Sequence, residues 1–485
     1  MAVRTLKKIY FFDDFLFEES QRLRRVFGRA ARDPAVRDEK PGQIFYDTLV
    51  GRYRKYCDVD RKDDRKDEAS MGLLESDDAI RWEPVTVPPD TDRYTRLNPH
   101  ILLTTGPGEG PGSIYLDEED PDPRRRYKAS SAAGILYTSP DGIRWTALKE
   151  RPPWGIWHSD SNNQIWYNPV RKTWQLSFRP ESGDRRVFVC ESSDLKNWSV
   201  PICAIMLGPR DPVGTEFYSL HTYKFQDIFV GTAVYCLFTP NIGQGVVWRI
   251  SAILVPELVY SYDGLSWTRT EWRELVPLSP PGEMGEAMMF VNAAFNDPGD
   301  PSKIRLFAMA EAGEHGPAPA GVVKHPAGFN EGWQYRLRRE GWVYLKSTGD
   351  LAYLRSRPME TTSGKMSLNV LCPNGMARVQ FCDLNGKPYP GFTFADCEPI
   401  CGDYIEAVPR WKNKENFAEL IGKIFKIEIQ LFAGELYCIN GDWYHYCGDL
   451  PVGTFDWDVT RAKCYAEWLA EQKKAQETRV GPRER

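Results

Sequence analysis

Apolar and polar residues alternate over short stretches along most of this chain, as in KTWQLSFRP (172–180) and KIFKIEIQLF (423–432). A period of two places neighbouring side chains on opposite faces, so these stretches predict β-strands with one buried face. The pattern changes near the C-terminus, where TRAKCYAEWLAEQKKAQETR (460–479) is rich in helix-forming residues and Gly481-Pro482 follows it. We therefore expect an all-β protein with a short C-terminal helix.

A repeated turn motif organises the first two thirds of the chain. It occurs as SDDAIRW (76–82), SPDGIRW (139–145), SSDLKNW (192–198) and SYDGLSW (261–267), and its Trp residues lie 63, 53 and 69 residues apart. Each interval has room for about four short strands, which is typical of one blade of a β-propeller. We expect a five-bladed β-propeller over residues 1–345, whose fifth blade, near 284–345, lacks the motif.

The Asp of this motif has an architectural interpretation. In a tight turn its carboxylate accepts hydrogen bonds from backbone amides, the Gly supplies conformational freedom, and the Trp packs between neighbouring blades. Asp141 and Asp263 are therefore expected to stabilise the turn that each blade repeats, and not to take part in catalysis.

The sequence pattern differs after residue 345, where the turn motif no longer occurs. ARVQFCDL (377–384) alternates and leads into Asn385-Gly386, a hairpin turn signal. This pattern predicts an antiparallel β-sandwich over residues 346–455, followed by a helical tail over 456–485.

Composition and charge exclude several classes of partner. Lys and Arg number 62 against 67 Asp and Glu, so no basic excess exists to bind nucleic acid. No apolar run is long enough to cross a bilayer, so we expect no membrane association. The 11 scattered cysteines indicate a reducing cytoplasm, or export if a signal sequence precedes this chain. The aromatic content of 13% suits sugar binding, since flat rings stack on sugar faces.

Several longer stretches resemble a known group of proteins. YFFDDFLFEESQRLRRV (10–26), DPDPRRRYKAS (120–130) and SDSNNQIWYNPVRKTWQLSFRP (159–180) resemble bacterial five-bladed-propeller glycoside hydrolases related to families 32 and 43. GKPYPGFTFADCEPICGDYIEAVPRWKN (386–413) resembles the β-sandwich that often follows in that group. The chain lacks the Trp-x-Asn-Asp-Pro-Asn-Gly block of family 32, so the resemblance does not imply activity on fructans.

The resemblance implies carboxyl groups around a central funnel, where the innermost strand of each blade begins. Glycoside hydrolysis needs two of them, one acting as acid and one as base or nucleophile. The catalytic candidates at predicted strand entrances are Asp14, Asp160 and Glu216, with Glu286 in reserve. Glu216 is the candidate general acid and Asp160 the candidate second carboxylate. The architectural alternatives are a rim position for Glu216 and an Asx-stabilised turn around Asp160.

Other polar residues at these entrances are candidates for contacts with substrate. They are Asp13, His100, His158, Asn162, Asn163, Arg179, Tyr218, His221, Glu311 and His315. No residue spacing requires a metal or another cofactor, although a structural cation at the funnel axis is compatible with the fold.

The sequence therefore predicts a glycoside hydrolase acting on a furanoside or short oligosaccharide, with homo-oligomerisation left open. The alternatives are a carbohydrate-binding propeller without catalysis, or another sugar-processing enzyme such as a lyase or phosphorylase. Two carboxyls facing each other across the funnel at roughly 5–10 Å would distinguish the hydrolase.

Overall fold

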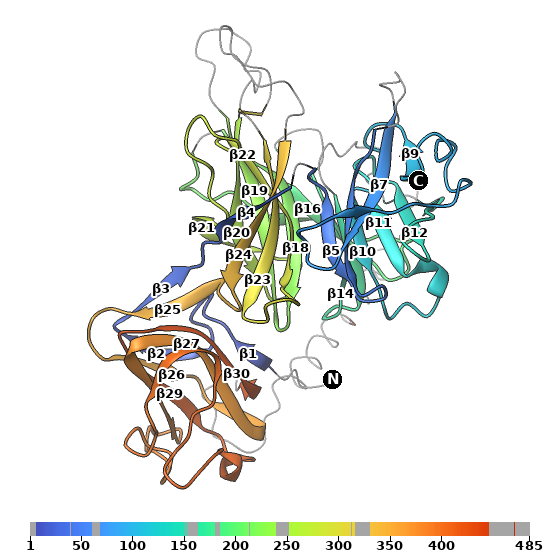
Figure 1. The fold of residues 1–485 in the computed structure, drawn as a ribbon. Helices are drawn as coiled ribbons and strands as arrows, with labels where there is room; N and C mark the ends of the chain where they lie inside the picture. The colour runs from blue at the N-terminus through green and yellow to red at the C-terminus, as the bar shows by residue number, and fades with distance from the viewer. Residues whose placement is uncertain are drawn as a thin grey trace, which may run out of the picture. The chain divides into compact units, whose positions relative to one another are not determined.

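In the described residues, the regular secondary structure consists almost entirely of β-strands, which are grouped in two compact units. The computed structural model describes residues 6–38, 40–60, 68–150, 152, 163–179, 185–212, 214–238, 252–311, 313–315, 330–445 and 470 (Figure 1). One unit comprises residues 27–342, and the other comprises residues 1–26 together with 343–485.

The described part of residues 27–342 forms four sheets, which divide into the five blades of a propeller. Blade one contains β5 (Gln43–Asp47), β6 (Arg52–Asp58), β7 (Ala69–Ser76) and β8 (Glu83–Pro84), with β9 (Ile101–Thr105) also paired to β7. Blade two contains β10 (Ser113–Leu116), β11 (Tyr127–Ser130), β12 (Leu136–Ser139) and β13 (Thr146–Ala147), with the short 3-10 helix η1 (Pro123–Arg125) before β11. Blade three contains β14 (Gln164–Asn168), β15 (Thr173–Phe178), β16 (Val187–Ser192) and β17 (Ile202–Ile205).

Blades four and five share one continuous sheet. Blade four contains β18 (Thr215–Phe225), β19 (Ile228–Phe238), β20 (Ala252–Ser261) and β21 (Thr268–Glu274). Blade five contains β22 (Met288–Asn296), β23 (Lys303–Glu311), β24 (Asn330–Arg338) and β4 (Ala31–Asp38). A single parallel pair, Leu254 with Met288, joins the two blades.

The five innermost strands close into a ring. Contacts run from β5 to β10, β14, β18 and β22, and from β22 back to β5. The expected five-bladed propeller is therefore confirmed. Its last blade is completed by β4, which pairs antiparallel with β24 although it precedes blade one in the sequence. The fifth blade lacks the turn motif because its third and fourth strands are not consecutive along the chain.

The four repeated motifs form the same turn between the third and fourth strands of blades one to four. In each, the Ser hydroxyl bonds the Asp carboxylate at 3.0–3.1 Å, and one Asp oxygen accepts from the two backbone N–H groups that lie two and three residues later, at 2.8–2.9 Å. These backbone hydrogen bonds hold the pKa of Asp78 and of Asp194 below the ordinary value.

Three of these turns are also bound by the preceding blade of the ring. Arg54 of blade one donates to the carbonyl of Asp141 at 2.6 Å, and Asn168 of blade three donates to the carbonyl of Asp263 at 2.7 Å. Arg305 of blade five donates to the carbonyl of Asp78 at 2.7 Å. The motif Asp is thus architectural, as its sequence context predicts.

The core of the propeller lies between neighbouring blades. The motif residue Trp267 of blade four is buried against a cluster that includes Trp166 of blade three. Likewise Trp145 of blade two packs edge-on against Tyr56 of blade one, with ring centroids 6.2 Å apart. Each large side chain buried in this way contributes roughly 1.5–3 kcal/mol.

The second unit is the expected β-sandwich, to which the chain's N-terminal strands also belong. Its strands are β1 (Leu6–Ile9), β2 (Phe17–Gln21), β3 (Leu23–Phe27), β25 (Val343–Ser347), β26 (Ala352–Ser356), β27 (Met359–Cys382), β28 (Ile400–Ala407), β29 (Lys426–Phe432) and β30 (Glu435–His445), with the 3-10 helix η3 (Ala418–Leu420). The first half of the long strand β27 pairs with β30 and its second half with β29. Aromatic rings around Phe381, including Phe417 and Phe425, fill the core.

The N-terminal segment differs from the expectation that the propeller spans residues 1–345. β1 pairs with β30 and β2 with β26, while β3 neighbours β25, so residues 1–26 belong to the second unit. The helical tail expected over 456–485 lies outside the described residues, apart from Ala470.

Candidate functional site

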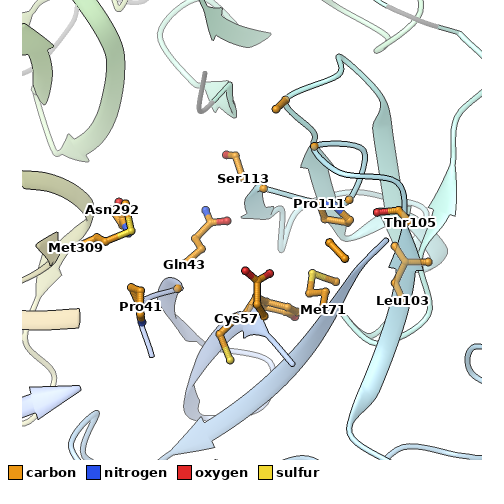
Figure 2. Close-up of a pocket in the computed structure, with 18 of the residues that line it drawn as sticks. Pro41, Gln43, Cys57, Met71, Leu103, Thr105, Pro111, Ser113, Asn292 and Met309 are labelled. Carbon is orange, nitrogen blue, oxygen red and sulfur yellow. The ribbon is translucent and has the colours of Figure 1, made fainter. Parts of the chain in front are cut away.

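A cavity of about 510 Å³ lies where the five innermost strands meet, and we call it the axial cavity. Each blade contributes to its wall one residue from its innermost strand, and we call these five the ring residues: Gln43, Ser113, Gln164, His221 and Asn292. Figure 2 shows Gln43, Ser113 and Asn292 around one opening.

Three ring residues lock adjacent blades together. The side-chain amide of Gln43 donates to the carbonyl of Ile114 at 3.1 Å and accepts from its N–H at 2.6 Å. The amide of Gln164 makes the same pair of bonds with the backbone of Thr222. The hydroxyl of Ser113 accepts from the N–H of Ile165 at 3.3 Å. In each case the partner directly follows the ring residue of the next blade, so these side chains serve the architecture.

The other two ring residues carry polar groups that the described chain does not satisfy. The Nε2 atom of His221 is buried and has no hydrogen-bond partner among the described residues. Burial lowers the pKa of His221 to about 4, so the imidazole is neutral near pH 7. Asn292 lies at an irregularity in the pairing of β22 with β23, and no side-chain hydrogen bond from it is found in the described part of the structure. These two side chains remain available to a ligand.

Two charged residues also line the axial cavity, Asp58 at the end of β6 and Lys40 before β5. Asp58 is the one carboxylate among the described lining residues. Although its side chain is open to solvent in the cavity, desolvation by the surrounding protein raises its pKa. One ammonium and one carboxylate leave the described wall without a net charge.

The loop from Thr105 to Gly112 forms another part of the wall. Gly108, Gly110, Pro111 and Gly112 all line the axial cavity, next to the apolar side chains of Met71 and Leu103 (Figure 2). This is the Gly- and Pro-rich stretch that links β9 to β10.

Asp13 and Asp14 do not occupy a blade entrance. They lie in the turn between β1 and β2, in the unit that contains the sandwich. The carboxylate of Asp13 accepts from the N–H of Phe15 at 3.0 Å, and exposed Asp14 forms an ion pair with Arg25. The two acids therefore do not begin the innermost strand of a blade, contrary to the prediction, because the residues around them form a turn of the sandwich unit.

Glu216 and its neighbours form a cluster at the start of β18. Glu216 is buried and lies 3.6 Å from the Nε atom of Arg185. Nearby, the ring of Tyr218 packs edge-on against His315 at 5.2 Å and against Phe290 at 5.6 Å, and the guanidinium of Arg179 covers it at 4.9 Å. None of these residues is among those that line the axial cavity.

Glu286 and Glu311 are not among the described residues that line the axial cavity. Glu286 precedes β22 and accepts a short hydrogen bond from the N–H of Gly282. Glu311 ends β23, where desolvation raises its pKa.

His100 does not lie at the entrance of an innermost strand, contrary to the prediction. Its Nδ1 atom bonds the carbonyl of Val85 at 3.0 Å, and the following strand β9 pairs with β7 of blade one. The innermost strand of blade two is β10.

Two predicted contact residues do line the axial cavity, Asn163 and His221. The amide of Asn163 donates to the carbonyl of Ser131 at 2.9 Å. Asp160, His158 and Asn162 lie outside the described residues.

The ring residues Gln43, Ser113, Gln164 and Asn292 were not among the predicted site residues, because each acquires its role only when five distant strands converge. A signal for three of them was present. QIFYD (43–47), SIYLD (113–117) and QIWYN (164–168) are similar pentapeptides, each beginning with a ring residue and forming an innermost strand.

No metal cluster or membrane-spanning helix is found in the described structure. Among those residues, no three His, Cys, Asp or Glu side chains gather closely enough to hold a metal ion. None of the helices seen there has the length and apolar character needed to span a membrane.

Comparisons with known proteins give weak structural similarity only. No protein-family model matches the chain, and no curated protein matches it. Among solved structures, it is similar to a GH32 β-fructofuranosidase of Bombyx mori, with 14% identity over 87% of this chain and 94% of the other and a TM-score of 0.34. An endo-arabinase from Bacteroides thetaiotaomicron matches with 13% identity over 62% and 96% of the chains and a TM-score of 0.35.

A glycosyl hydrolase from Bacteroides ovatus matches with 13% identity over 64% of this chain and 94% of the other, with a TM-score of 0.37. Because the scores are low, the assignment of five blades rests on the strand pairing and the closed ring of this chain itself.

Proposed function

We propose that this chain binds a neutral carbohydrate in its axial cavity. The observation that carries the proposal is the contrast among the ring residues: three are consumed by bonds between blades, whereas His221 and Asn292 are left for a ligand. Both side chains line the axial cavity and make no side-chain hydrogen bond to the described chain, so a ligand hydroxyl can pair with them there. The volume of about 510 Å³ is in the usual range for small-molecule sites.

The chemistry of the wall supports a sugar over a charged metabolite. A neutral imidazole and a carboxamide each both donate and accept hydrogen bonds, as sugar hydroxyls do. The charges of Asp58 and Lys40 offset each other, so the described wall offers no strong field for an anion or a cation.

Calorimetric titration with arabino-, xylo-, fructo- and galacto-oligosaccharides tests the proposal. We expect at least one to bind, and we expect His221→Leu to weaken that binding at least tenfold because it removes both ring nitrogens while filling the same space. His100→Leu is the matched control, since that histidine is outside the described wall of the axial cavity, and it should bind as the unaltered protein does. Equal affinity of the His221→Leu protein would contradict the proposal.

Hydrolysis of a glycosidic bond is the second candidate function, and Asp58 favours it. A carboxyl whose pKa is raised by desolvation stays protonated at higher pH and is suited to donate a proton to a leaving group. The reaction needs a second carboxylate. We propose Asp160 for this role because it lies three residues before Asn163, which lines the axial cavity.

A screen of nitrophenyl glycosides tests this candidate. If Asp58 is the acid, Asp58→Asn lowers kcat by roughly 10²–10⁴-fold, and the activity of the unaltered protein falls as the pH rises through the raised pKa. Asp160→Asn should cause a comparable loss, whereas Asp141→Asn, in a blade turn, serves as the control. Hydrolysis that survives Asp58→Asn undiminished would remove Asp58 from the reaction.

A further inference from the structure

The loop Thr105–Gly112 faces the axial cavity with almost no side chains. Gly108, Gly110 and Gly112 line the cavity, and the side chain of Pro111 is the bulkiest group that the loop adds after Thr105. The wall therefore presents peptide backbone directly to whatever occupies the cavity.

Hydrogen bonds hold this loop in place from behind. The Tyr137 hydroxyl donates to the carbonyl of Glu109 at 2.8 Å, and the N–H of Ala133 donates to the carbonyl of Gly108 at 2.9 Å. The N–H of Gly112 donates to the carbonyl of Ser130 at 2.9 Å. Because all three partners belong to blade two, the loop is a fixed wall.

The fold does not require glycine throughout this loop. Gly108 has a positive φ of 72°, which favours glycine, but Gly110 and Gly112 are not among the residues with a positive φ. A Cβ atom added at Gly112 would meet only the carbonyl of Ser130, at 3.7 Å, which is ordinary contact. The open space at Gly112 is therefore not explained by packing within the protein.

The loop also contains backbone donors that are not used within the described part of the protein. In the described part of the chain, the N–H groups of Gly108 and Gly110 make no hydrogen bond to protein. A second observation concerns the same cavity, since His221 lines it, is only 8% exposed and has an Nε2 atom without a hydrogen-bond partner among the described residues.

We propose that the loop Thr105–Gly112 is the specificity wall of the axial cavity. A sugar ring lies against its bare backbone, and a ring or substituent oxygen accepts from the N–H groups of Gly108 and Gly110. This inference rests on the proposed carbohydrate binding and adds that the missing side chains set the size of the sugar that fits. The expected ligand is a sugar wide enough to touch the backbone of this loop when it occupies the axial cavity.

Gly112→Leu tests the wall because it adds bulk beside the cavity at a position where the backbone tolerates a side chain. Gly208→Leu is the matched control, since Gly208 also lacks a positive φ, has open space around its Cβ position and lies outside the cavity lining. The probe is the oligosaccharide that binds the unaltered protein best, together with its constituent monosaccharide. Both variants are first checked by thermal melting for a folded propeller.

We expect Gly112→Leu to lower the affinity for the oligosaccharide at least tenfold and to lower the affinity for the monosaccharide less. Gly208→Leu should change neither affinity. Sugar binding that is weakened by His221→Leu but not by Gly112→Leu would contradict the role of the loop as specificity wall. The proposed function would then still stand. If Gly112→Leu does not fold, Gly110→Ala must still weaken the oligosaccharide, and unchanged affinity there overturns the wall. If the unaltered protein binds no sugar, the proposed function fails and the wall fails with it.

Discussion

At the scale of single residues, five aspartates that could be taken for catalytic groups form structural contacts instead. The motif carboxylates of Asp78, Asp141, Asp194 and Asp263 are occupied by backbone amides, and Asp14 is paired on the surface of another unit. The sequence identified the motif Asp correctly because its hydrogen bonds are local, reaching residues two and three positions away. It misplaced Asp14 because the partners of β1 and β2 lie more than 300 residues further along the chain.

The glycine of the turn motif provides a stability prediction at this scale. Gly142 has a φ of 75°, and a Cβ atom there would lie 2.4 Å from the hydroxyl of Tyr56 on the neighbouring blade. Gly51 has almost the same φ, 76°, but no atom within 4 Å of the Cβ position. Gly51→Ala should therefore cost about 1–2 kcal/mol for backbone strain alone.

Gly142→Ala should cost about 1–3 kcal/mol more than Gly51→Ala because it also pushes two blades apart. Chemical denaturation of the two variants measures the difference in the free energy of unfolding. Equal losses would show that the motif glycine serves only the turn and not the contact between blades.

At the scale of elements, local repeats were predictable and long-range closure was not. The turn motifs identify four blades because each motif joins consecutive strands. The pentapeptides QIFYD, SIYLD and QIWYN mark three innermost strands. The completion of blade five by β4 left no local signal, since its partner β24 begins at Asn330. The axial cavity was equally hard to foresee, because each ring residue acquires its role only when five distant strands converge.

At the scale of the whole propeller, the same five positions divide between holding the ring and serving a ligand. Gln43, Ser113 and Gln164 join their blades to the next ones, and the ring keeps its shape without His221 and Asn292 making such bonds. This division explains how a symmetric fold produces an asymmetric site. A ligand that meets His221 and Asn292 on blades four and five is expected to extend across the axial cavity to the backbone wall contributed by the loop before blade two.

A crystal structure of the protein with its best-binding oligosaccharide is the most direct test of this account. We predict a sugar ring in the axial cavity, with hydroxyl groups at about 2.7–3.2 Å from His221 and Asn292 and with Gln43 and Gln164 still bonded to the neighbouring blades. A sugar bound elsewhere, or one whose contacts in the cavity exclude both His221 and Asn292, would contradict the account.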